Sequence, residues 1–218
     1  MMNYAVIDTE TANTPKINNK LDVKNGQVYD FGAWIINEQG EKLDYLSLVN
    51  KDVFFGMKEA MQTAYYADKI PQYMRDIWKH RRKVVDTWQM WREFTELCRK
   101  WNIKGIIAHN AYFDLTVLNS TMRYQTKSKK RFFFPYNIPI IDSLKLAQNT
   151  ICKTDDYITF CKTNNYMTNH STPRPRATAE ILWKYLTKNN DYCEEHTGLS
   201  DAEIEAQIFI KCMKMSVA

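Results

Sequence analysis

Apolar runs alternate with polar segments along the N-terminal part of the chain, and this pattern predicts three strands. Residues 4–7 are apolar throughout, as in a short buried strand, and residues 27–37 carry apolar side chains in a loose alternation. Residues 42–49 return as a third strand after a turn at 38–41. We expect these strands to form an antiparallel meander, with the polar segment 13–25 as an exposed loop.

The rest of the chain combines helical spacing with two more apolar strands. The predicted helices are residues 57–67, 71–83, 87–101 and 111–122, and the predicted strands are 104–108 and 138–141. Residues 57–101 would form a helical insertion beside the sheet. Because no repeat or domain-scale linker is visible, we predict a single α/β domain over residues 1–218, with a central five-stranded mixed sheet flanked by helices.

Composition argues for an ordered cytoplasmic protein. The chain has 218 residues, of which 44% are hydrophobic and 13% aromatic, and it contains only six glycines and six prolines. No apolar run reaches the length of a membrane helix, and the first residues show no signal-peptide pattern. An odd number of scattered cysteines without a C-x-x-C pair predicts reduced thiols and no zinc site: Cys98, Cys152, Cys161, Cys193 and Cys212.

Acidic residues at the ends of predicted elements are the candidate functional groups. Asp8 and Glu10 follow the first strand, and extended backbone would direct both carboxylates to one face, although D-x-E is also a common surface triplet. Asp114 falls in the first turns of the helix after strand 104–108, where an acid can simply interact with the helix dipole. Asp142 is expected to cap a helix, not to be a fifth metal ligand.

A C-terminal segment adds a histidine and a further acid. Ser200 and Glu203 have the spacing of a capping box, so we expect a helix to begin at Asp201. The positive end of that helix would favour an ionised carboxylate there. Gly198 would supply backbone freedom to the loop that carries His196, which on its own could be an ordinary solvated histidine.

Four carboxylates gathered at one cleft would repel one another unless cations neutralise them. Two divalent ions would supply four positive charges and could hold the attacking and leaving oxygens of a phosphodiester. A histidine beside them could take a proton from the attacking water near neutral pH. The pattern therefore predicts a metal-dependent nuclease, and the net charge of +5 is compatible with a polyanionic partner.

The same residues resemble the motifs of a known enzyme family. Residues 6–11 (VIDTET), 109–114 (HNAYFD) and 196–202 (HTGLSDA) look like the three exonuclease motifs of the DnaQ-like DEDDh 3′–5′ exonucleases, which have an RNase H-like fold. The resemblance extends from residue 4 to about residue 213. Residues 172–213 also look like exonucleases encoded by phages of Gram-positive bacteria.

The resemblance implies a role for each motif residue. The ligands of two Mg²⁺ ions, which Mn²⁺ could replace, would be Asp8, Glu10, Asp114 and Asp201. His196 would be the general base for water, and the reaction would release nucleoside 5′-monophosphates from single-stranded 3′ ends of DNA or RNA. The residues near the terminal nucleotide would be Thr9, Thr11, His109 and Asn110. The last two side chains could instead simply hold their loop.

Basic segments outside the motifs have two interpretations. Residues 79–83 and 127–131 could follow phosphates, with neighbouring aromatic rings stacking on bases. The preferred interpretations are a charged helix face above core tryptophans for the first, and a core or dimer contact for the phenylalanines 132–134 beside the second. Arg174 and Arg176 lie in a proline-containing loop that could approach the cleft.

Two other functions stay open from the sequence. One is a non-catalytic nucleic-acid-binding or inhibitory protein on the same fold, but all five catalytic groups are present. The other is an accessory subunit that proofreads for a polymerase, but no separate polymerase-binding tail is evident. The expected partner is nucleic acid, without membrane contact, and a homodimer stays open because related exonucleases often pair.

Overall fold

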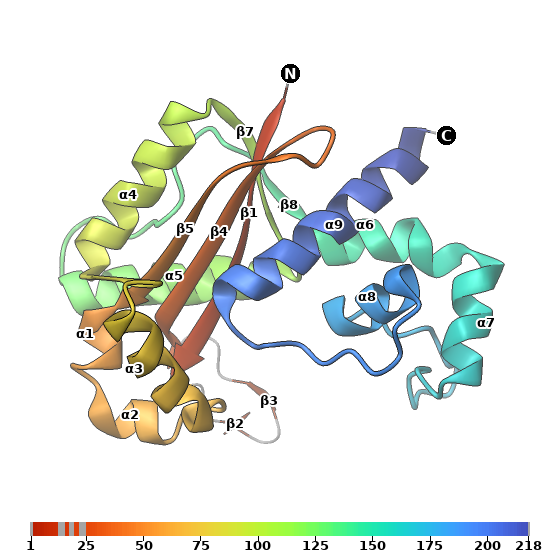
Figure 1. Ribbon diagram of the computed structural model, residues 1–218, viewed down its shortest axis with the longest axis horizontal. Coiled ribbons are helices and arrows are strands. Elements are labelled where there is room, and N and C mark those ends of the chain that lie inside the picture. The colour runs from red at the N-terminus through yellow and green to blue at the C-terminus, as the bar shows by residue number, and fades with distance from the viewer. Residues whose placement is uncertain (1, 13–15, 18–19, 22–24, 218) are drawn as a thin grey trace.

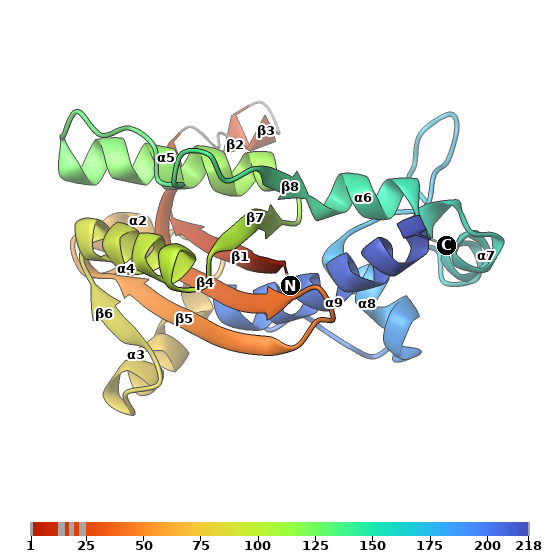
Figure 2. The ribbon, with the colours of Figure 1, turned by 90° about the horizontal axis from the view of Figure 1, so that it is seen from above.

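A six-stranded mixed sheet forms the centre of the protein. The computed structural model describes residues 2–12, 16–17, 20–21 and 25–217, and its strands lie in the order β6-β5-β4-β1-β7-β8 (Figures 1 and 2). The strands are β1 (Asn3–Ala12), β4 (Gln27–Asn37), β5 (Lys42–Asn50), β6 (Lys83–Val85), β7 (Ile103–Ala108) and β8 (Ile140–Asp142). The predicted meander is confirmed, because β4 pairs antiparallel with both β1 and β5. The remaining pairs are parallel: β6 with β5, β7 with β1, and β8 with β7.

One segment differs from the sequence prediction, and another lies largely outside the residues that the structure describes. Residues 84–86 were expected to separate two helices, but Val84 and Val85 extend the sheet by pairing with β5. β-branched side chains favour this extended backbone, and the sheet therefore has six strands where five were expected. The predicted loop 13–25 lies largely outside the described residues. Its described parts, β2 (Lys16–Ile17) and β3 (Lys20–Leu21), pair with each other.

Helices cover both faces of the sheet. On one face lie α4 (Thr87–Lys100) and α5 (Ala111–Thr126), and the other is crossed by α9 (Gly198–Val217) (Figures 1 and 2). Beside α9 stand α6 (Ser143–Asn149), η3 (Ile151–Lys153), α7 (Asp155–Thr163) and α8 (Ala179–Thr187). Within the described residues, no helix has the length and apolar content needed to cross a membrane.

The predicted helical insertion divides into two parts. Its last helix, α4, packs on the sheet with its apolar face in the main core. The earlier part, residues 57–85, is called the α2–α3 segment here and packs with α1 at one end of the strands (Figure 1). The segment follows α1 (Lys51–Phe54) and contains α2 (Lys58–Gln62), η2 (Ala67–Lys69) and α3 (Ile70–Trp78).

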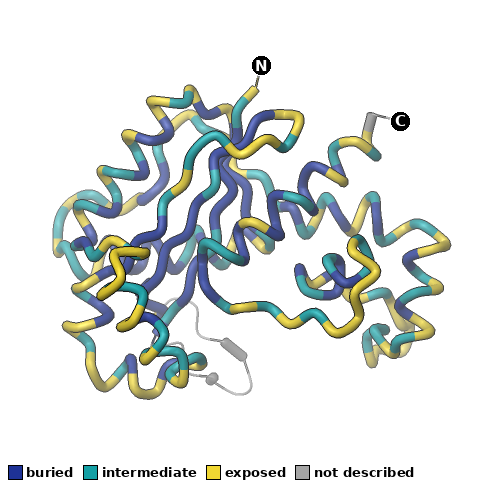
Figure 3. The backbone as a smooth tube through the Cα atoms, viewed as in Figure 1, coloured by how far each residue is buried: buried dark blue, intermediate teal, exposed yellow. Residues whose placement is uncertain are grey.

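Alternate residues of β1 face the two helical layers. Ile7 belongs to the apolar cluster beneath α4 and α5, whereas Val6 belongs to the cluster beneath α9. Because side chains alternate along a strand, Asp8 and Glu10 continue the α9 face and Thr9 continues the α5 face. The central strands are buried over most of their length (Figure 3). Both acids therefore lie within a buried strand that continues past them, not just beyond its end.

The start of α9 lies against the sheet at a pair of glycines. A Cβ added to Gly32 of β4 would lie 2.0 Å from the carbonyl carbon of Gly198. A Cβ added to Gly198 would lie 2.7 Å from the amide nitrogen of Gly32 and 2.9 Å from the carbonyl oxygen of Asp8. Gly198 therefore permits a close approach and does not supply the predicted backbone freedom. The residue of this loop with a positive φ is His196, at 49°.

The N-terminus of α9 also differs from the predicted capping box. The helix begins at Gly198, before the expected start at Asp201. The hydroxyl of Ser200 donates to Glu195 Oε2 at 3.0 Å, and Glu203 forms an ion pair with a lysine of β5. The expected reciprocal bonds between Ser200 and Glu203 are thus replaced by contacts with the preceding loop and the sheet.

Replacing Gly32 by alanine is expected to destabilise the protein. The added Cβ would overlap the backbone of α9, so the helix would have to move away from the sheet. Overpacking of this kind lowers the free energy of unfolding by about 1–3 kcal/mol or more. Chemical denaturation measures the change, and an unaltered midpoint would contradict the close approach of α9 to β4.

Candidate active site

Five carboxylates converge where β1, α5 and α9 meet. Asp8 and Glu10 come from β1, and Asp114 comes from the first turn of α5. Asp201 and Glu205 lie on the first turns of α9, held over β1 by the glycine contact. Asp8 is partly exposed and the other four are buried. The structure thus brings together the four acids predicted from the sequence and adds Glu205.

The closest group in the cluster combines two acids with the motif histidine. Glu10, Asp201 and His196 each offer one ligand atom, and these atoms all lie within 4.8 Å of one another. On the opposite face of β1, Thr9 Oγ1 donates to Asp114 Oδ1 at 2.8 Å. Thr9 therefore fixes the orientation of this carboxylate through a buried hydrogen bond.

Burial and mutual repulsion raise the pKa of these carboxyls. For Asp8, burial is the largest cause, followed by the negative charges of Glu205 and Asp114. Burial likewise raises the pKa of Asp114 to about 7 and that of Asp201 to about 8. Ionising all five groups together is therefore unfavourable unless a positive charge is placed among them.

The donor set fits a hard divalent cation. Carboxylate oxygens are the ligands that Mg²⁺ and Mn²⁺ prefer, and Glu10 and Asp201 offer one each within 4.8 Å of the other, with further carboxylates of the cluster nearby. Asp201 Oδ1 is buried and has no hydrogen-bond partner among the described residues. Buried polar atoms normally have a partner, and a cation held between Asp201 and Glu10 would provide one.

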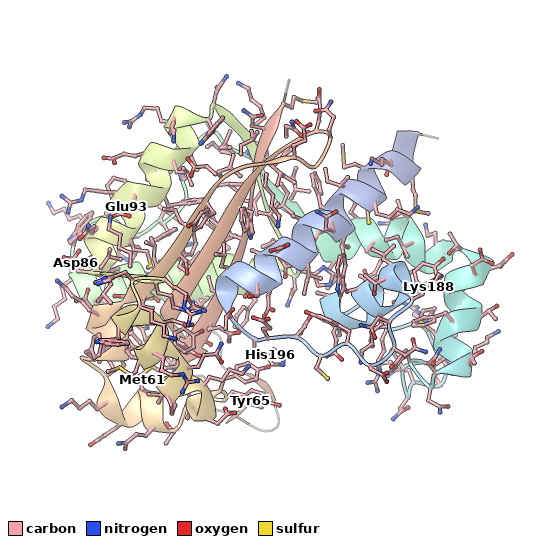
Figure 4. All side chains as sticks on the ribbon, in the orientation of Figure 1. Met61, Tyr65, Asp86, Glu93, Lys188 and His196 are labelled. Atoms are coloured by element: carbon pink, nitrogen blue, oxygen red, sulfur yellow. The ribbon has the colours of Figure 1, made fainter. Side chains whose placement is uncertain are left out.

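His196 lies on the loop before α9 and contacts the α2–α3 segment (Figure 4). Its ring stacks on Tyr66, with centroids 4.2 Å apart and planes inclined by 16°. Lys69 Nζ donates to the carbonyl oxygen of Glu195, and His196 Nδ1 lies 3.7 Å from Glu194 Oε2. Burial, and then the positive charge of Lys69, lower the pKa of His196, which favours the neutral, proton-accepting imidazole.

A buried ion pair links the α2–α3 segment to the same loop. Asp30 lies opposite Glu10 in the β1–β4 pairing and is fully buried. Its carboxylate accepts hydrogen bonds from Arg82 Nη1 at 2.9 Å and from the Tyr73 hydroxyl at 2.6 Å. It also accepts the backbone N–H of Gly198 at 2.9 Å. One carboxylate therefore connects the sheet, the α2–α3 segment and the start of α9.

His109 and Asn110 of the second motif make hydrogen bonds within the protein. The His109 amide donates to Glu205 Oε2 at 3.0 Å, and its ring Nε2 lies 2.6 Å from the carbonyl oxygen of Ala177. Burial lowers the pKa of His109, and a carbonyl can only accept, so the ring is neutral with its proton on Nε2. Asn110 has a φ of 71° at the N-cap position of α5, without a capping side-chain bond, and its amide donates to Asp142.

Other predicted features have mixed outcomes. Asp142 Oδ1 accepts two backbone amides at the start of α6, so the predicted helix cap is confirmed. The interpretation of residues 79–83 as a helix face above core tryptophans is wrong, because α3 ends at Trp78, whose side chain is 79% exposed. The basic run instead forms a turn that directs one arginine to a buried partner. Of the three phenylalanines, Phe133 and Phe134 are core residues, as expected, whereas Phe132 is exposed.

Three residues around the cluster were missed by sequence analysis. Glu205 follows Asp201 by one helical turn, a spacing that places both on one face of α9 and could have indicated it. Asp30 is a single acid within a buried, largely apolar strand, which is itself a sign of a polar partner. No local pattern marks Tyr66, because its contact with His196 joins segments far apart in the chain.

A cavity of about 1150 Å³ opens on the acidic cluster. Asp8, Asp201 and Glu205 contribute to its wall, together with His109 and Asn110. Much of the remaining wall comes from α6 and from the connection between α7 and α8. The cluster is therefore accessible to a ligand considerably larger than a water molecule.

Arg82→Met is expected to lower the free energy of unfolding by about 3–5 kcal/mol, because it leaves Asp30 buried without its counter-charge. Arg81→Met is the matched control, since Arg81 is exposed and its pair with Asp76 contributes at most about 1 kcal/mol. Adding Asp30→Asn to Arg82→Met should recover part of the loss. Equal destabilisation by the two single variants, measured by chemical denaturation, would contradict the importance of the buried pair.

Asp8→Asn is expected to stabilise the metal-free protein, because it removes a charge from a buried group of like charges. A gain of about 1 kcal/mol would raise Tm by roughly 2–4 °C in a chain of this size. Mg²⁺ or Mn²⁺ should raise the Tm of the wild type more than that of the variant. Glu96→Gln, an exposed change on α4, is the control. A wild-type Tm that neither ion changes would contradict a cation site here.

Solved structures provide an independent comparison for the fold. The nuclease domain of 3′hExo, a DEDDh family member bound to rAMP, matches with a TM-score of 0.56 and 14% identity over 97% of this chain and 92% of that chain. E. coli exonuclease I in complex with a dA16 oligonucleotide gives a TM-score of 0.46 and 12% identity over 95% of this chain, which spans 40% of that enzyme. No family model and no curated protein matches the sequence. The chain thus has the RNase H-like fold of the DnaQ-like DEDDh exonucleases.

Proposed function

We propose that this protein is a metal-dependent 3′–5′ exonuclease that hydrolyses phosphodiester bonds of DNA or RNA. The observation that carries the proposal is the convergence of four motif carboxylates and His196 in one cluster, of which Asp8 and Asp201 line the cavity. Such a set of oxygen ligands beside a neutral imidazole suits hydrolysis of a phosphodiester. The similarity of the fold to a DEDDh nuclease domain is consistent with this proposal.

The proposed ligands of two Mg²⁺ or Mn²⁺ ions are Asp8, Glu10, Asp114 and Asp201. When bound, the ions would neutralise the carboxylates and stabilise the negative charge that develops on the reacting phosphodiester. Asp114 would be oriented for this by the hydrogen bond from Thr9. The raised pKa values of the buried acids would fall as positive charge is added, so all four would be ionised in the loaded protein.

His196 is the proposed general base. As water attacks phosphorus, the neutral imidazole would take its proton, and the bond from phosphorus to the 3′ oxygen of the preceding nucleotide would break. The products are a nucleoside 5′-monophosphate and a strand with a new 3′ hydroxyl. Glu194, 3.7 Å from His196 Nδ1, would stabilise the imidazolium that forms, and Tyr66 would hold the ring plane.

The remaining motif residues are proposed to position the terminal nucleotide. The Thr9 hydroxyl is occupied by Asp114, so Thr9 would act on substrate through its backbone. Thr11 is half-buried near the end of β1, close in sequence to the ligand Glu10. The side chain of His109 holds neighbouring backbone, whereas Asn110 is exposed at the cavity wall.

The reducing cytoplasm is the proposed location of this activity. All five cysteines are free thiols, and three of them are buried: Cys98, Cys161 and Cys212. Free thiols of this kind persist where glutathione and thioredoxin keep cysteines reduced. Thiol titration of the purified protein after denaturation should therefore detect five free thiols per chain.

The proposal predicts shortening of 5′-labelled single-stranded DNA or RNA from the 3′ end, with Mg²⁺ or Mn²⁺ but not with EDTA. Asp8→Ala should abolish cleavage, because it removes a proposed metal ligand and with it the positive charge that would stabilise the reacting phosphodiester. His196→Ala should lower kcat by about a hundredfold or more, the usual contribution of a general base. His80→Ala, which changes an exposed histidine in the turn after α3, is the matched control and should leave kcat unchanged.

Two results would contradict the proposal in different ways. A wild-type protein that degrades neither nucleic acid with either ion would point to a binding role or to a partner-dependent enzyme. Full activity of His196→Ala would mean that another group takes the proton. Internal fragments without a 3′-end ladder would indicate an endonuclease on the same catalytic groups.

A further inference from the structure

The wall of the cavity beside the acidic cluster also includes a short basic loop. We call residues 166–176, between α7 and α8, the arginine loop. It stands beside α6 and α7 as a narrow excursion of the chain (Figure 2). Arg174 and Arg176 line the same cavity as Asp8 and Asp201. One continuous space therefore has carboxylates at one part of its wall and guanidinium groups at another.

The backbone of the arginine loop is held in place by hydrogen bonds. Thr168 N–H donates to the carbonyl of Arg174 at 2.8 Å, and Arg176 N–H donates to the carbonyl of Tyr166 at 2.9 Å. The hydroxyl of Tyr157, on α7, donates to the carbonyl of Arg176 at 2.6 Å. The loop is thus a fixed small hairpin, and its position relative to α7 does not depend on its charged side chains.

The loop is also connected directly to the second motif. His109 Nε2 donates to the carbonyl of Ala177, the residue after Arg176, at 2.6 Å. The amide of the same histidine donates to Glu205 of the acidic cluster. A single residue therefore spans from the carboxylates to the base of the arginine loop and sets the position of one relative to the other.

The two guanidinium groups are available to a ligand. Both arginines are exposed, and neither side chain forms an ion pair or hydrogen bond within the described part of the chain. By contrast, Arg81 and Arg82 both pair with carboxylates. Guanidinium presents a planar set of donors that matches the oxygens of a phosphate, and two of them suit neighbouring phosphates of one strand.

We propose that Arg174 and Arg176 bind backbone phosphates of the strand upstream of the scissile bond. This inference rests on the proposed exonuclease function, and it makes a strand of several nucleotides the substrate, in preference to a dinucleotide. The acidic cluster would then receive the terminal phosphodiester while the arginine loop holds the preceding part of the same strand. The contacts are to phosphate and carry no base specificity.

The test compares a long and a short substrate in two double variants. Arg174→Gln/Arg176→Gln removes both guanidinium groups from the cavity wall. Arg92→Gln/Arg99→Gln removes the same charge from exposed arginines of α4, which covers the other face of the sheet. The substrates are a 5′-labelled octanucleotide, of DNA or RNA as the wild type prefers, and the p-nitrophenyl ester of thymidine 5′-monophosphate, which has no upstream phosphate.

The loop variant is expected to raise KM for the octanucleotide roughly tenfold or more, with little change in kcat, because only binding of the upstream strand is lost. Its kcat/KM for the ester should stay within about twofold of the wild type, and the α4 variant should match the wild type on both substrates. The slope of log affinity against log salt should become shallower by about 1.4, since each phosphate contact on a single strand contributes about 0.7.

The outcomes separate failure of this inference from failure of the proposed function. Equal losses on both substrates, or equal losses in the two variants, would overturn the role of the arginine loop while leaving exonuclease activity intact. A wild type inactive on both substrates would overturn the proposed function. In that case fluorescence anisotropy of the labelled octanucleotide in EDTA still decides whether the loop variant binds more weakly than the α4 variant, and equal affinity would overturn the inference.

Discussion

The contact between two glycines, Gly32 of β4 and Gly198 of α9, is the constraint on which the acidic cluster depends. Without side chains at these positions, the helix lies directly on the sheet, next to the carbonyl of Asp8. This contact brings Asp201 and Glu205 beside the carboxylates of β1, from segments separated by most of the chain. A larger residue at either position would separate the helix from the sheet and disperse the charges that form the candidate metal site.

Holding five acids together is unfavourable by itself, and the structure compensates with neutral and positive groups around them. Apolar packing on both faces of the sheet supplies most of the stability, while Arg82 is paired with the additional buried acid, Asp30. The α2–α3 segment thereby has a structural role at the site as well as at the sheet edge. It provides the ring that stacks on His196 and the lysine that binds the preceding backbone.

Local sequence patterns revealed the elements and the motif acids because both depend on short-range spacing. The alternation in β1 placed Asp8 and Glu10 on one face, and the start of α5 placed Asp114 in its first turn. The start of α9 was misjudged because its first turn is determined by packing against Gly32, which no capping pattern records. Tyr66 could not be predicted for a similar reason, since its contact with His196 is made only once the α2–α3 segment has packed against the C-terminal loop.

The place of α9 in the chain has a consequence for biosynthesis. It follows every other described helix and strand, yet the loop before it carries His196 and its first turns carry Asp201. A nascent chain that has folded only through α8 would contain Asp8, Glu10 and Asp114 but neither the histidine nor the fourth acid. The proposed nuclease would therefore be inactive on the ribosome, next to messenger and ribosomal RNA, until its final described helix had been synthesised and packed against the sheet.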